Sequence, residues 1–250
     1  MSEHILRPIG YIHTDFEEKF GLPRQSGIVE GLLGEIHFEP AYRNPDALVG
    51  ITGFSHLWLI WGFHKHDEKI EQALAEGKFS PMTRPPRLGG NEKRGVFATR
   101  SPFRPNGLGL SVVKLESVDL AGVADGEGPV IHVSGIDMLD GTPIYDIKPY
   151  VPYVDSIPGA AGGFTDPTGE GKNGENEERL SVAIPPELLV KIPEEQRENV
   201  RRLIAIDPRP AYQKEPLRIY GMAYAGMEIR FRVEGDRAVV VDVSSRINAR

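Results

Sequence analysis

The stretch from Arg94 to Ser111 carries the residues best suited to binding an anionic or carboxylate-bearing ligand. It contains Arg94, Arg100 and Arg104, and no acidic residue follows them until Glu116. Prolines and glycines in the same stretch restrict the backbone to tight turns, in which amide groups can face outward. The alternative is a solvated loop whose arginines cap neighbouring carbonyl groups. The density of Arg and Asn beside an apolar strand favours a ligand.

Two carboxylates, Asp137 and Asp140, occur in the turn 135–143. Paired carboxylates at such a turn could accept ribose hydroxyl groups or act as a general base. The alternative is an Asx turn, in which Asp140 bonds its own backbone, and spacing alone slightly favours that alternative. The stretch that follows the turn adds the polar side chains of Lys148 and Tyr150.

His64, His66 and Asp67 have a spacing found in hydrolytic metal sites. Catalytic sites need three protein ligands and structural sites four, and no clear motif completes either set. We therefore expect no metal and interpret the histidine as a strand-end residue that hydrogen-bonds a ligand. A second polar segment, Pro23–Gln25, is predicted to lie on a loop, where its planar groups could meet a ligand or cap a strand end.

The composition excludes several classes of protein and of functional site. The chain has 250 residues, no cysteine and a net charge of −7. Disulfides, thiolate metal sites and a cysteine nucleophile are excluded, which suits a reducing cytoplasm. We expect no membrane-spanning segment and no signal peptide, hence a cytoplasmic protein. The charge argues against a nucleic-acid binder that relies on bulk positive charge, but it permits a local arginine patch on an acidic body.

Short apolar segments separated by turn residues predict a mainly β fold, with a barrel or sandwich in domain 1–155. The aromatic run 54–63 is predicted as a central strand and 68–76 as a short amphipathic helix. The stretch 80–91, rich in Pro and Gly, is expected to be a loop. The other predicted strands are 7–13, 27–38, 96–98, 110–118, 130–135 and 144–147.

A Gly-rich and acidic segment, 156–178, is predicted to be a linker or insertion. It precedes a small α+β domain, 179–250, with helices expected at 186–192 and 193–206. Strands are expected at 217–224, 228–233 and 237–243, and a Pro-bracketed turn, 207–212, presents Arg209 and Tyr212.

Eight segments resemble, in the same order and over nearly the whole chain, those of the TrmO-like, S-adenosylmethionine-dependent tRNA (adenine-N6)-methyltransferase family. They are Pro23–Gln25, Phe54–Trp58, Pro85–Asn91, Gly95–Ser101, Arg104–Asn106, Asp140–Pro143, Asp146–Tyr150 and Asp207–Tyr212. The family implies a barrel-like β domain unrelated to Rossmann-type methyltransferases, and no Gly-x-Gly-x-x-Gly follows a strand here. It also implies a homodimer and a tRNA partner whose adenosine at position 37 carries threonylcarbamoyl.

The resemblance also implies roles for individual residues. The methyl donor would be bound by Pro23, Arg24, Gln25, His64, Lys65, Arg100, Leu110, Asp137, Met138, Leu139 and Asp140. Lys65 departs from the family pattern, in which a Gln often follows the histidine. The candidate proton acceptors are Asp140, Asp137 and the Asn106 carbonyl, and the choice among them stays open.

The predicted substrate-binding residues are Arg84, Arg104, Lys148, Tyr150, Arg209 and Tyr212. Arg104 or Arg84 would clamp the threonylcarbamoyl carboxylate, while Arg209 and Tyr212 would engage the anticodon stem. Two other functions are considered. One is a metal-dependent hydrolase that uses His64, His66 and Asp67, and the other is a non-enzymatic adaptor that senses S-adenosylmethionine and binds RNA. The resemblance first, and the residue chemistry second, favour the methyltransferase.

Overall fold

The computed structural model describes residues 5–65, 76–85, 92–124, 126–165, 178–209, 215 and 218–246. The chain divides into two compact units. The barrel unit comprises the described residues of Met1–His13, Leu33–Ser134 and Gly141–Ala160, and the second unit comprises those of Thr14–Leu32, Gly135–Asp140 and Ala161–Arg250. The second unit therefore includes two segments from the first half of the chain besides the C-terminal residues.

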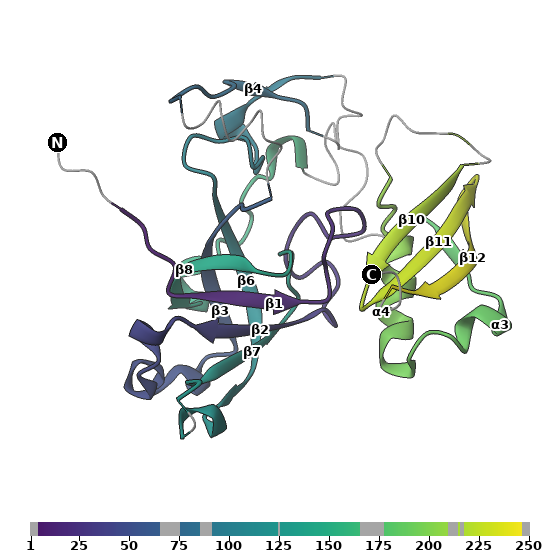
Figure 1. Ribbon diagram of the computed structural model, residues 1–250. Helices are drawn as coiled ribbons and strands as arrows, with labels where there is room; N and C mark the ends of the chain where they lie inside the picture. The colour runs from purple at the N-terminus through teal and green to yellow at the C-terminus, as the bar shows by residue number, and fades with distance from the viewer. Residues whose placement is uncertain are drawn as a thin grey trace. The chain divides into compact units, whose positions relative to one another are not determined.

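Six strands close into a β-barrel in the order β1-β2-β7-β6-β3-β8 (Figure 1). The strands are β1 (Gly10–Thr14), β2 (Leu33–Phe38), β3 (His56–Gly62), β6 (Leu108–Asp119), β7 (Val130–Ser134) and β8 (Thr142–Pro149). The pairs β1–β8, β2–β7, β7–β6, β6–β3 and β3–β8 are antiparallel. The predictions at 7–13, 110–118, 130–135 and 144–147 are confirmed as strands, with shifted ends.

The core of the barrel follows from the alternation of side chains along each strand. In β3, Leu57, Leu59 and Trp61 are buried, and the residues between them are partly exposed. β3 is hydrogen-bonded to β6 on one side and to β8 on the other, so it tolerates apolar residues on both faces. The prediction of a central strand at 54–63 is confirmed.

The predicted barrel strand at 27–38 is wrong in its first half, which is not a strand. The segment 27–38 is a strand only at Leu33–Phe38. Gly27 has a φ of +78°, a left-handed conformation that strands do not contain, and the residues up to Leu32 are turns. The chain from Thr14, the end of β1, to Leu32 therefore forms a long connection to β2, which we call the 14–32 excursion.

A second correction concerns Val96–Ala98, which is a 3-10 helix, η5, and not a strand. The residues just before it, Arg94–Gly95, form β5, which pairs with β4 (Met82–Thr83). The expected loop 80–91 therefore contains regular structure at 82–83. The predicted helix 68–76 lies outside the described residues except for Glu76.

Short helical elements fill the connections of the barrel unit. They are η1 (Pro40–Tyr42), η2 (Pro45–Leu48), η3 (Ile51–Gly53), η6 (Ala121–Val123) and α2 (Pro152–Asp155). Proline at the first position of η1, η2 and α2 fixes φ at a helical value where no backbone donor is needed. The sequence prediction did not include α2.

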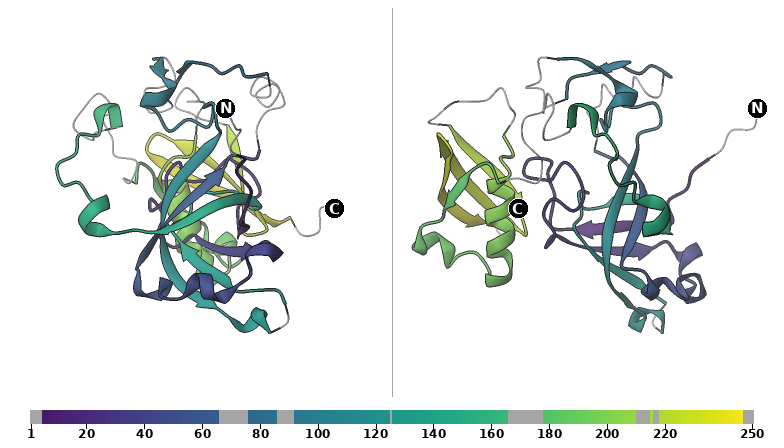
Figure 2. Two further views of the ribbon diagram at one scale, coloured as in Figure 1. Left: turned by 90° about the vertical axis from the view of Figure 1, so that its left-hand side faces the viewer. Right: turned by 180° about the vertical axis from the view of Figure 1, so that it is seen from behind.

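The second unit contains a four-stranded sheet in the order β10-β11-β12-β9. Its C-terminal strands are the yellow arrows of Figure 2. Its elements are η7 (Gly163–Thr165), β9 (Ser181–Ala183), α3 (Pro186–Leu189), η8 (Glu194–Gln196), α4 (Arg197–Ala205), β10 (Ile219–Tyr224), β11 (Met227–Glu234) and β12 (Arg237–Ser245). Both predicted helices and all three predicted strands are confirmed, whereas the short β9 was not predicted. The mainly β class, with a barrel and a small α+β part, is confirmed.

Helix α4 buries the residues that its sequence pattern predicts to be buried. Val200, Leu203 and Ile204 are fully buried, as their spacing of three and four residues predicts. Glu198 lies in the first turn and Arg202 in the last, where each charge complements the helix dipole. Most of the predicted linker, 166–177, lies outside the described residues.

A close approach between β3 and β6 gives Gly109 a structural role. A Cβ atom at Gly109 would overlap the indole ring of Trp61. The indole Nε1 donates to Ser111 Oγ at 3.0 Å, and the ring lies 4.4 Å from that of Phe63, measured between centroids. The indole is therefore held from two sides, and moving it aside would disturb both contacts.

We predict that Gly109→Ala lowers the free energy of unfolding by about 1–3 kcal/mol, because the added methyl group forces the Trp61 ring or the strand to shift. Urea unfolding followed by tryptophan fluorescence measures this change. The matched control is Gly53→Ala, since no atom lies within 4 Å of a Cβ built there. Equal stability of the two variants would contradict the prediction.

Candidate functional site

Strand directions bring several predicted site residues to one end of the barrel. β3 is antiparallel to both β6 and β8, so the C-terminal end of β3 meets the N-terminal ends of these two strands. His64 and Lys65 follow β3, Asn106 precedes β6, Leu110 lies near the start of β6, and Thr142 begins β8. We call these five residues the barrel end. His64 Nδ1 and Thr142 Oγ1 lie 3.3 Å apart, within hydrogen-bonding distance.

The loop that leads into β6 is braced by Arg104. Its guanidinium donates to the carbonyl groups of Thr99 at 3.1 Å and Ser101 at 3.2 Å. The Gly107 carbonyl accepts the amide of Phe63 at 2.9 Å, which ties the loop to the end of β3. For Arg104, the structure thus shows the alternative considered from the sequence, an arginine that caps neighbouring carbonyl groups.

The remaining predicted residues of the barrel unit are largely at the surface. Arg84, Arg100 and Lys148 are exposed, and Leu110 is 56% exposed although it lies within β6. Tyr150 is half-buried, with its amide donating to the His56 carbonyl at 3.0 Å. An exposed Leu on a barrel strand is a reasonable contact for the flat face of a base.

In the second unit, the turn Gly135–Asp140 is hydrogen-bonded to both ends of the 14–32 excursion. At the first end, Asp140 Oδ1 accepts the Thr14 amide at 3.1 Å and Thr14 Oγ1 donates to the Met138 carbonyl at 3.2 Å. At the other end, the Gly27 amide donates to the Gly135 carbonyl at 2.8 Å. Ile136, Met138 and Leu139 are buried. The carboxylates of Asp137 and Asp140 are thus the polar groups of an otherwise apolar turn.

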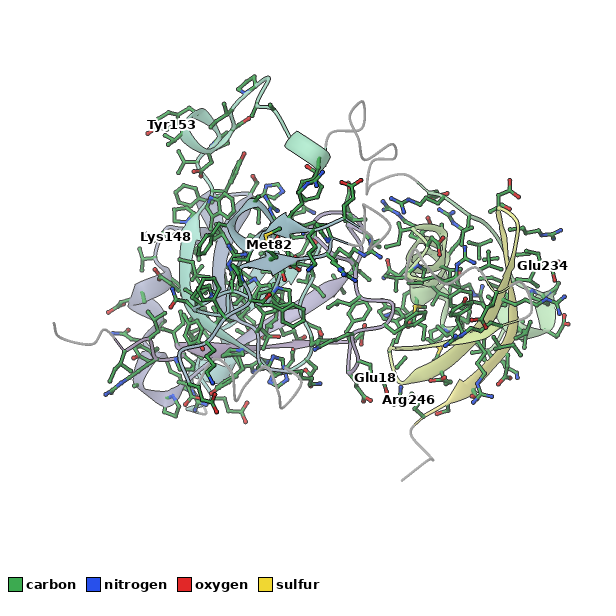
Figure 3. All side chains as sticks on the ribbon, turned by 90° about the horizontal axis from the view of Figure 1, so that it is seen from above. Glu18, Met82, Lys148, Tyr153, Glu234 and Arg246 are labelled. Carbon is green, nitrogen blue, oxygen red and sulfur yellow. The ribbon has the colours of Figure 1, made fainter. Side chains whose placement is uncertain are left out.

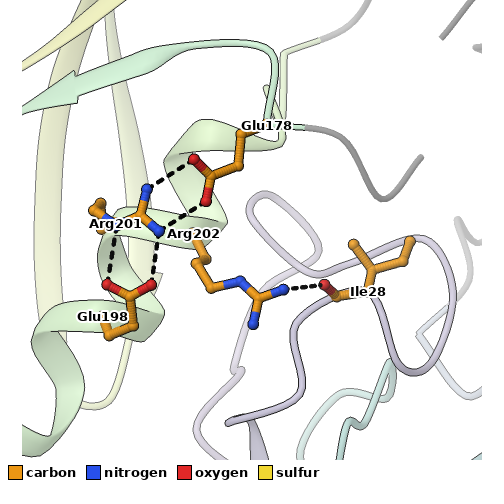
Figure 4. A network of polar contacts seen from close by, with 5 residues as sticks. All are labelled: Ile28, Glu178, Glu198, Arg201 and Arg202. Atoms are coloured by element: carbon orange, nitrogen blue, oxygen red, sulfur yellow. Dashed lines mark hydrogen bonds and ion pairs between the residues drawn. The ribbon is translucent and has the colours of Figure 1, made fainter. Parts of the chain in front are cut away.

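Helix α4 fixes the far end of the same excursion. Asn199 Nδ2 donates to the Gly31 carbonyl at 2.9 Å. Figure 4 shows the second bond, from Arg202 to the Ile28 carbonyl at 3.0 Å. Asn199 Nδ2 also lies 3.1 Å from the hydroxyl oxygen of Tyr224. Burial raises the pKa of Tyr224, and its phenol donates to Gln196 Oε1 at 2.7 Å. Sequence reasoning missed these residues, because they bond backbone atoms far away in the chain.

The near end of the excursion is held by the last strands of the sheet. The Phe16 ring lies 5.0 Å from that of Tyr224, and the Ala225 amide donates to the Asp15 carbonyl at 3.1 Å. Burial raises the pKa of Asp15. Arg246 pairs with Glu18 at 2.7 Å (Figure 3). Both ends of the segment that carries Pro23–Gln25 are therefore attached to C-terminal residues.

Arg24 lines a small hollow of the second unit, with a volume of about 140 Å³. Its walls also include Lys19, Arg179 and Asp207, together with apolar groups of Leu22, Ile28, Ile206 and Pro208. The Asp207 carboxylate is bonded by Arg209, at 2.7 and 2.9 Å. The hollow therefore has a net positive charge, because its lining includes Lys19, Arg24 and Arg179.

Arg209 is mostly buried rather than extended into solvent, with 13% of its side chain exposed. Its hydrogen bonds to Asp207 raise its pKa, so the guanidinium stays charged, and it lies over the Tyr220 ring at 5.9 Å. Asp207 takes the left-handed conformation, φ 56°, which is uncommon for a residue other than glycine. Tyr212, the other residue predicted on this turn, lies outside the described residues.

Among the residues that the structure describes, no group of three or more His, Asp or Glu could hold a metal ion. The residues His66 and Asp67 of the proposed hydrolase site lie outside them. In the same described part of the chain, no helix has the length and apolar character needed to cross a membrane.

Comparison with known proteins identifies the family. The model of the tRNA-methyltransferase O N-terminal domain matches residues 11–156, and that of the TrmO C-terminal domain matches residues 177–246. The chain belongs to the tRNA-methyltransferase O family. This membership confirms the resemblance seen in the sequence, and the barrel end and the Gly135–Asp140 turn both fall within the N-terminal match.

Individual members of the tRNA-methyltransferase O family extend this similarity over the full length. A protein of Escherichia coli K12 named tRNA (adenine(37)-N6)-methyltransferase is 37% identical over 237 residues, 93% of this chain and 94% of its own. A Pseudomonas aeruginosa protein whose name describes an S-adenosylmethionine-dependent methyltransferase is 40% identical over 258 residues, 96% of this chain and 98% of its own. A crystal structure of TrmO from Pseudomonas aeruginosa superposes with a TM-score of 0.72, at 31% identity, covering 98% of this chain and 100% of that one.

We predict that Arg202→Ala speeds hydrogen exchange of amides in 27–32 by about fivefold, because a hydrogen bond worth about 1 kcal/mol is lost. Exchange in β10–β12 should not change. The control is Arg201→Ala, which removes only surface ion pairs with Glu178 and Glu198, each at 2.7 Å (Figure 4). Equal exchange in the two variants, read by mass spectrometry, would contradict the assigned role of Arg202.

Proposed function

We propose that this protein transfers a methyl group from S-adenosylmethionine to N6 of threonylcarbamoyl-adenosine at position 37 of tRNA. The observation that carries the proposal is membership of the tRNA-methyltransferase O family over both of its domains. The name of the Escherichia coli relative supports adenine 37 as the site. The threonylcarbamoyl group is supported by Arg104, on the loop that leads into β6, and by the exposed Arg84, because a guanidinium suits a substrate with its own carboxylate.

The residues proposed for the donor site fit the groups of S-adenosylmethionine. Its carboxylate suits Arg24 or Arg100, its ribose hydroxyls suit Asp137 or Asp140, and its adenine suits the exposed Leu110. Pro23, Gln25, His64, Lys65, Met138 and Leu139 complete the proposed set. Bound S-adenosylmethionine would supply an electrophilic methyl group. The protein then contributes mainly orientation, because in-line methyl transfer depends on the placement of the nucleophile.

The acceptor nitrogen must lose a proton as its bond to the methyl group forms. We propose Asp140 as the group that accepts or orients this proton, with Asp137 and the Asn106 carbonyl as the other candidates. Asp140 is oriented by the Thr14 amide, which bonds its Oδ1 atom at 3.1 Å. A carboxylate held in this way keeps its second oxygen at a defined position.

On the RNA side, Arg84 or Arg104 is proposed to pair with the threonylcarbamoyl carboxylate. Lys148 and Tyr150 are proposed to contact the anticodon loop, and Arg209 and Tyr212 the stem. The positive hollow at Lys19 and Arg179 supports a phosphate contact in the second unit. Domain 1–155 is thus proposed to be catalytic and 179–250 to bind tRNA, in a cytoplasmic homodimer.

Two preparations of one threonine-accepting tRNA, with and without threonylcarbamoyl-adenosine, test this proposal. We expect radiolabelled methyl from S-adenosylmethionine to enter only the modified tRNA, because an arginine site built for a carboxylate is left unpaired by plain adenine. Equal label in both would refute the carboxylate-reading site. Donor binding without any label would instead support the adaptor, and turnover lost with a chelator would support the hydrolase.

We predict that Asp140→Asn lowers kcat for methyl transfer by about 10²-fold or more, because an amide cannot accept the proton. The amide oxygen can still accept the Thr14 hydrogen bond, so the turn should stay in place. Asp146→Asn is the control, since Asp146 is an exposed residue of β8. Single-turnover kinetics measure the rate. Wild-type turnover of Asp140→Asn would remove Asp140 from this role.

A further inference from the structure

A cluster of exposed apolar side chains lies on the loops around β4 and β5. Phe97 is 73% exposed, Met82 45%, Phe79 43% and Phe103 40% (Figure 3 labels Met82). We call these four residues the aromatic face. Large apolar side chains gathered on a monomer surface commonly mark a binding site, because exposing them to water is unfavourable.

Hydrogen bonds connect the members of the aromatic face. The Phe79 and Phe97 rings lie 6.1 Å apart, measured between centroids. Met82 pairs with Gly95 in the β4–β5 ladder, two residues before Phe97. Ser101 Oγ lies 3.5 Å from Thr83 Oγ1 and accepts the Phe103 amide at 3.2 Å. The four side chains therefore belong to one continuous substructure of the barrel unit.

The loops that carry the aromatic face are braced from within. Val96, beside Phe97, is buried, and its carbonyl accepts the Thr99 hydroxyl at 2.9 Å. Arg104, beside Phe103, donates to two carbonyl groups of the same loop. A preorganised aromatic surface loses little conformational entropy when a ligand binds.

The charge around the aromatic face is opposite to that of the whole protein. The described residues 76–85 and 92–104 contain six Lys and Arg and two Glu, in a chain whose net charge is −7. Both glutamates already form ion pairs, Glu76 with Lys78 at 2.8 Å and Glu92 with Arg94 at 2.9 Å. The surface thus combines exposed phenylalanines with excess positive charge, the combination that binds single-stranded nucleic acid.

We propose that Phe97 and Phe103 stack on unpaired bases of the tRNA anticodon loop while the surrounding cations contact its phosphates. The inference rests on the proposed function and names the part of the protein that holds the loop. A second copy of the chain is a poorer occupant. A two-fold interface built on this surface would bring the same positive charges against each other.

Leu and Trp substitutions distinguish stacking from simple apolar contact. Phe97→Leu keeps an apolar side chain but removes the aromatic ring, so KM for tRNA should rise about 5- to 100-fold, with KM for S-adenosylmethionine unchanged. Phe97→Trp should retain the wild-type KM. The control is Phe54→Leu, since Phe54 is 39% exposed on another loop of the barrel unit. We expect the same pattern at Phe103.

Direct titration of the wild type and Phe97→Leu with a fluorescent anticodon stem-loop RNA tests the inference without requiring turnover. Weaker binding of the Leu variant supports stacking even if no methyl transfer is seen, so failure of the proposed function remains distinguishable. Equal affinity of the two proteins would overturn the inference. A shift of Phe97→Leu to a smaller oligomer in size-exclusion chromatography, with RNA affinity retained, would assign the aromatic face to a second copy of the chain.

Discussion

The structure depends on the hydrogen bonds that attach the 14–32 excursion to its neighbours in the second unit. The Gly135–Asp140 turn bonds the excursion near both ends, and α4 bonds it through Asn199 and Arg202. These contacts place both segments proposed to bind the methyl donor, 23–25 and 137–140, in the same unit as the C-terminal residues. The C-terminal residues therefore fix the geometry of the 14–32 excursion, which carries the proposed donor-binding residues 23–25.

The barrel contributes a rigid frame on which separate loops converge. Because β3 is antiparallel to both of its neighbours, residues distant in sequence lie at the same end of the barrel. The acidic body and the locally positive loops serve different purposes. Net negative charge disfavours non-specific binding to nucleic acid, and the proposed RNA contacts rely on local groups of Lys and Arg. Arg104 and Arg202 show that some of these arginines also hold the backbone in place, because each donates to main-chain carbonyl groups.

Much of the fold could be predicted because alternation and turn residues report burial along a strand. The prediction was wrong at 27–32 and at 96–98, where apolar residues lie in turns shaped by glycine and by local hydrogen bonds. Asn199 and Arg202 could not be found from the sequence. Their bonds to carbonyl groups 168 and 174 positions away depend on the fold and leave no local pattern. The ion pair between Asp207 and Arg209 joins residues only two positions apart, so it could have been predicted from the sequence.

The proposed reaction is defined by the atom of the nucleoside that receives the methyl group. Mass spectrometry of nucleosides released from threonylcarbamoyl-modified tRNA, after reaction with the protein and S-adenosylmethionine, identifies that atom directly. We expect one added methyl group on threonylcarbamoyl-adenosine, with fragmentation placing it on the adenine and not on the ribose or the threonine. A methyl group on another nucleoside, or on the ribose or carboxylate of this one, would contradict the proposed reaction.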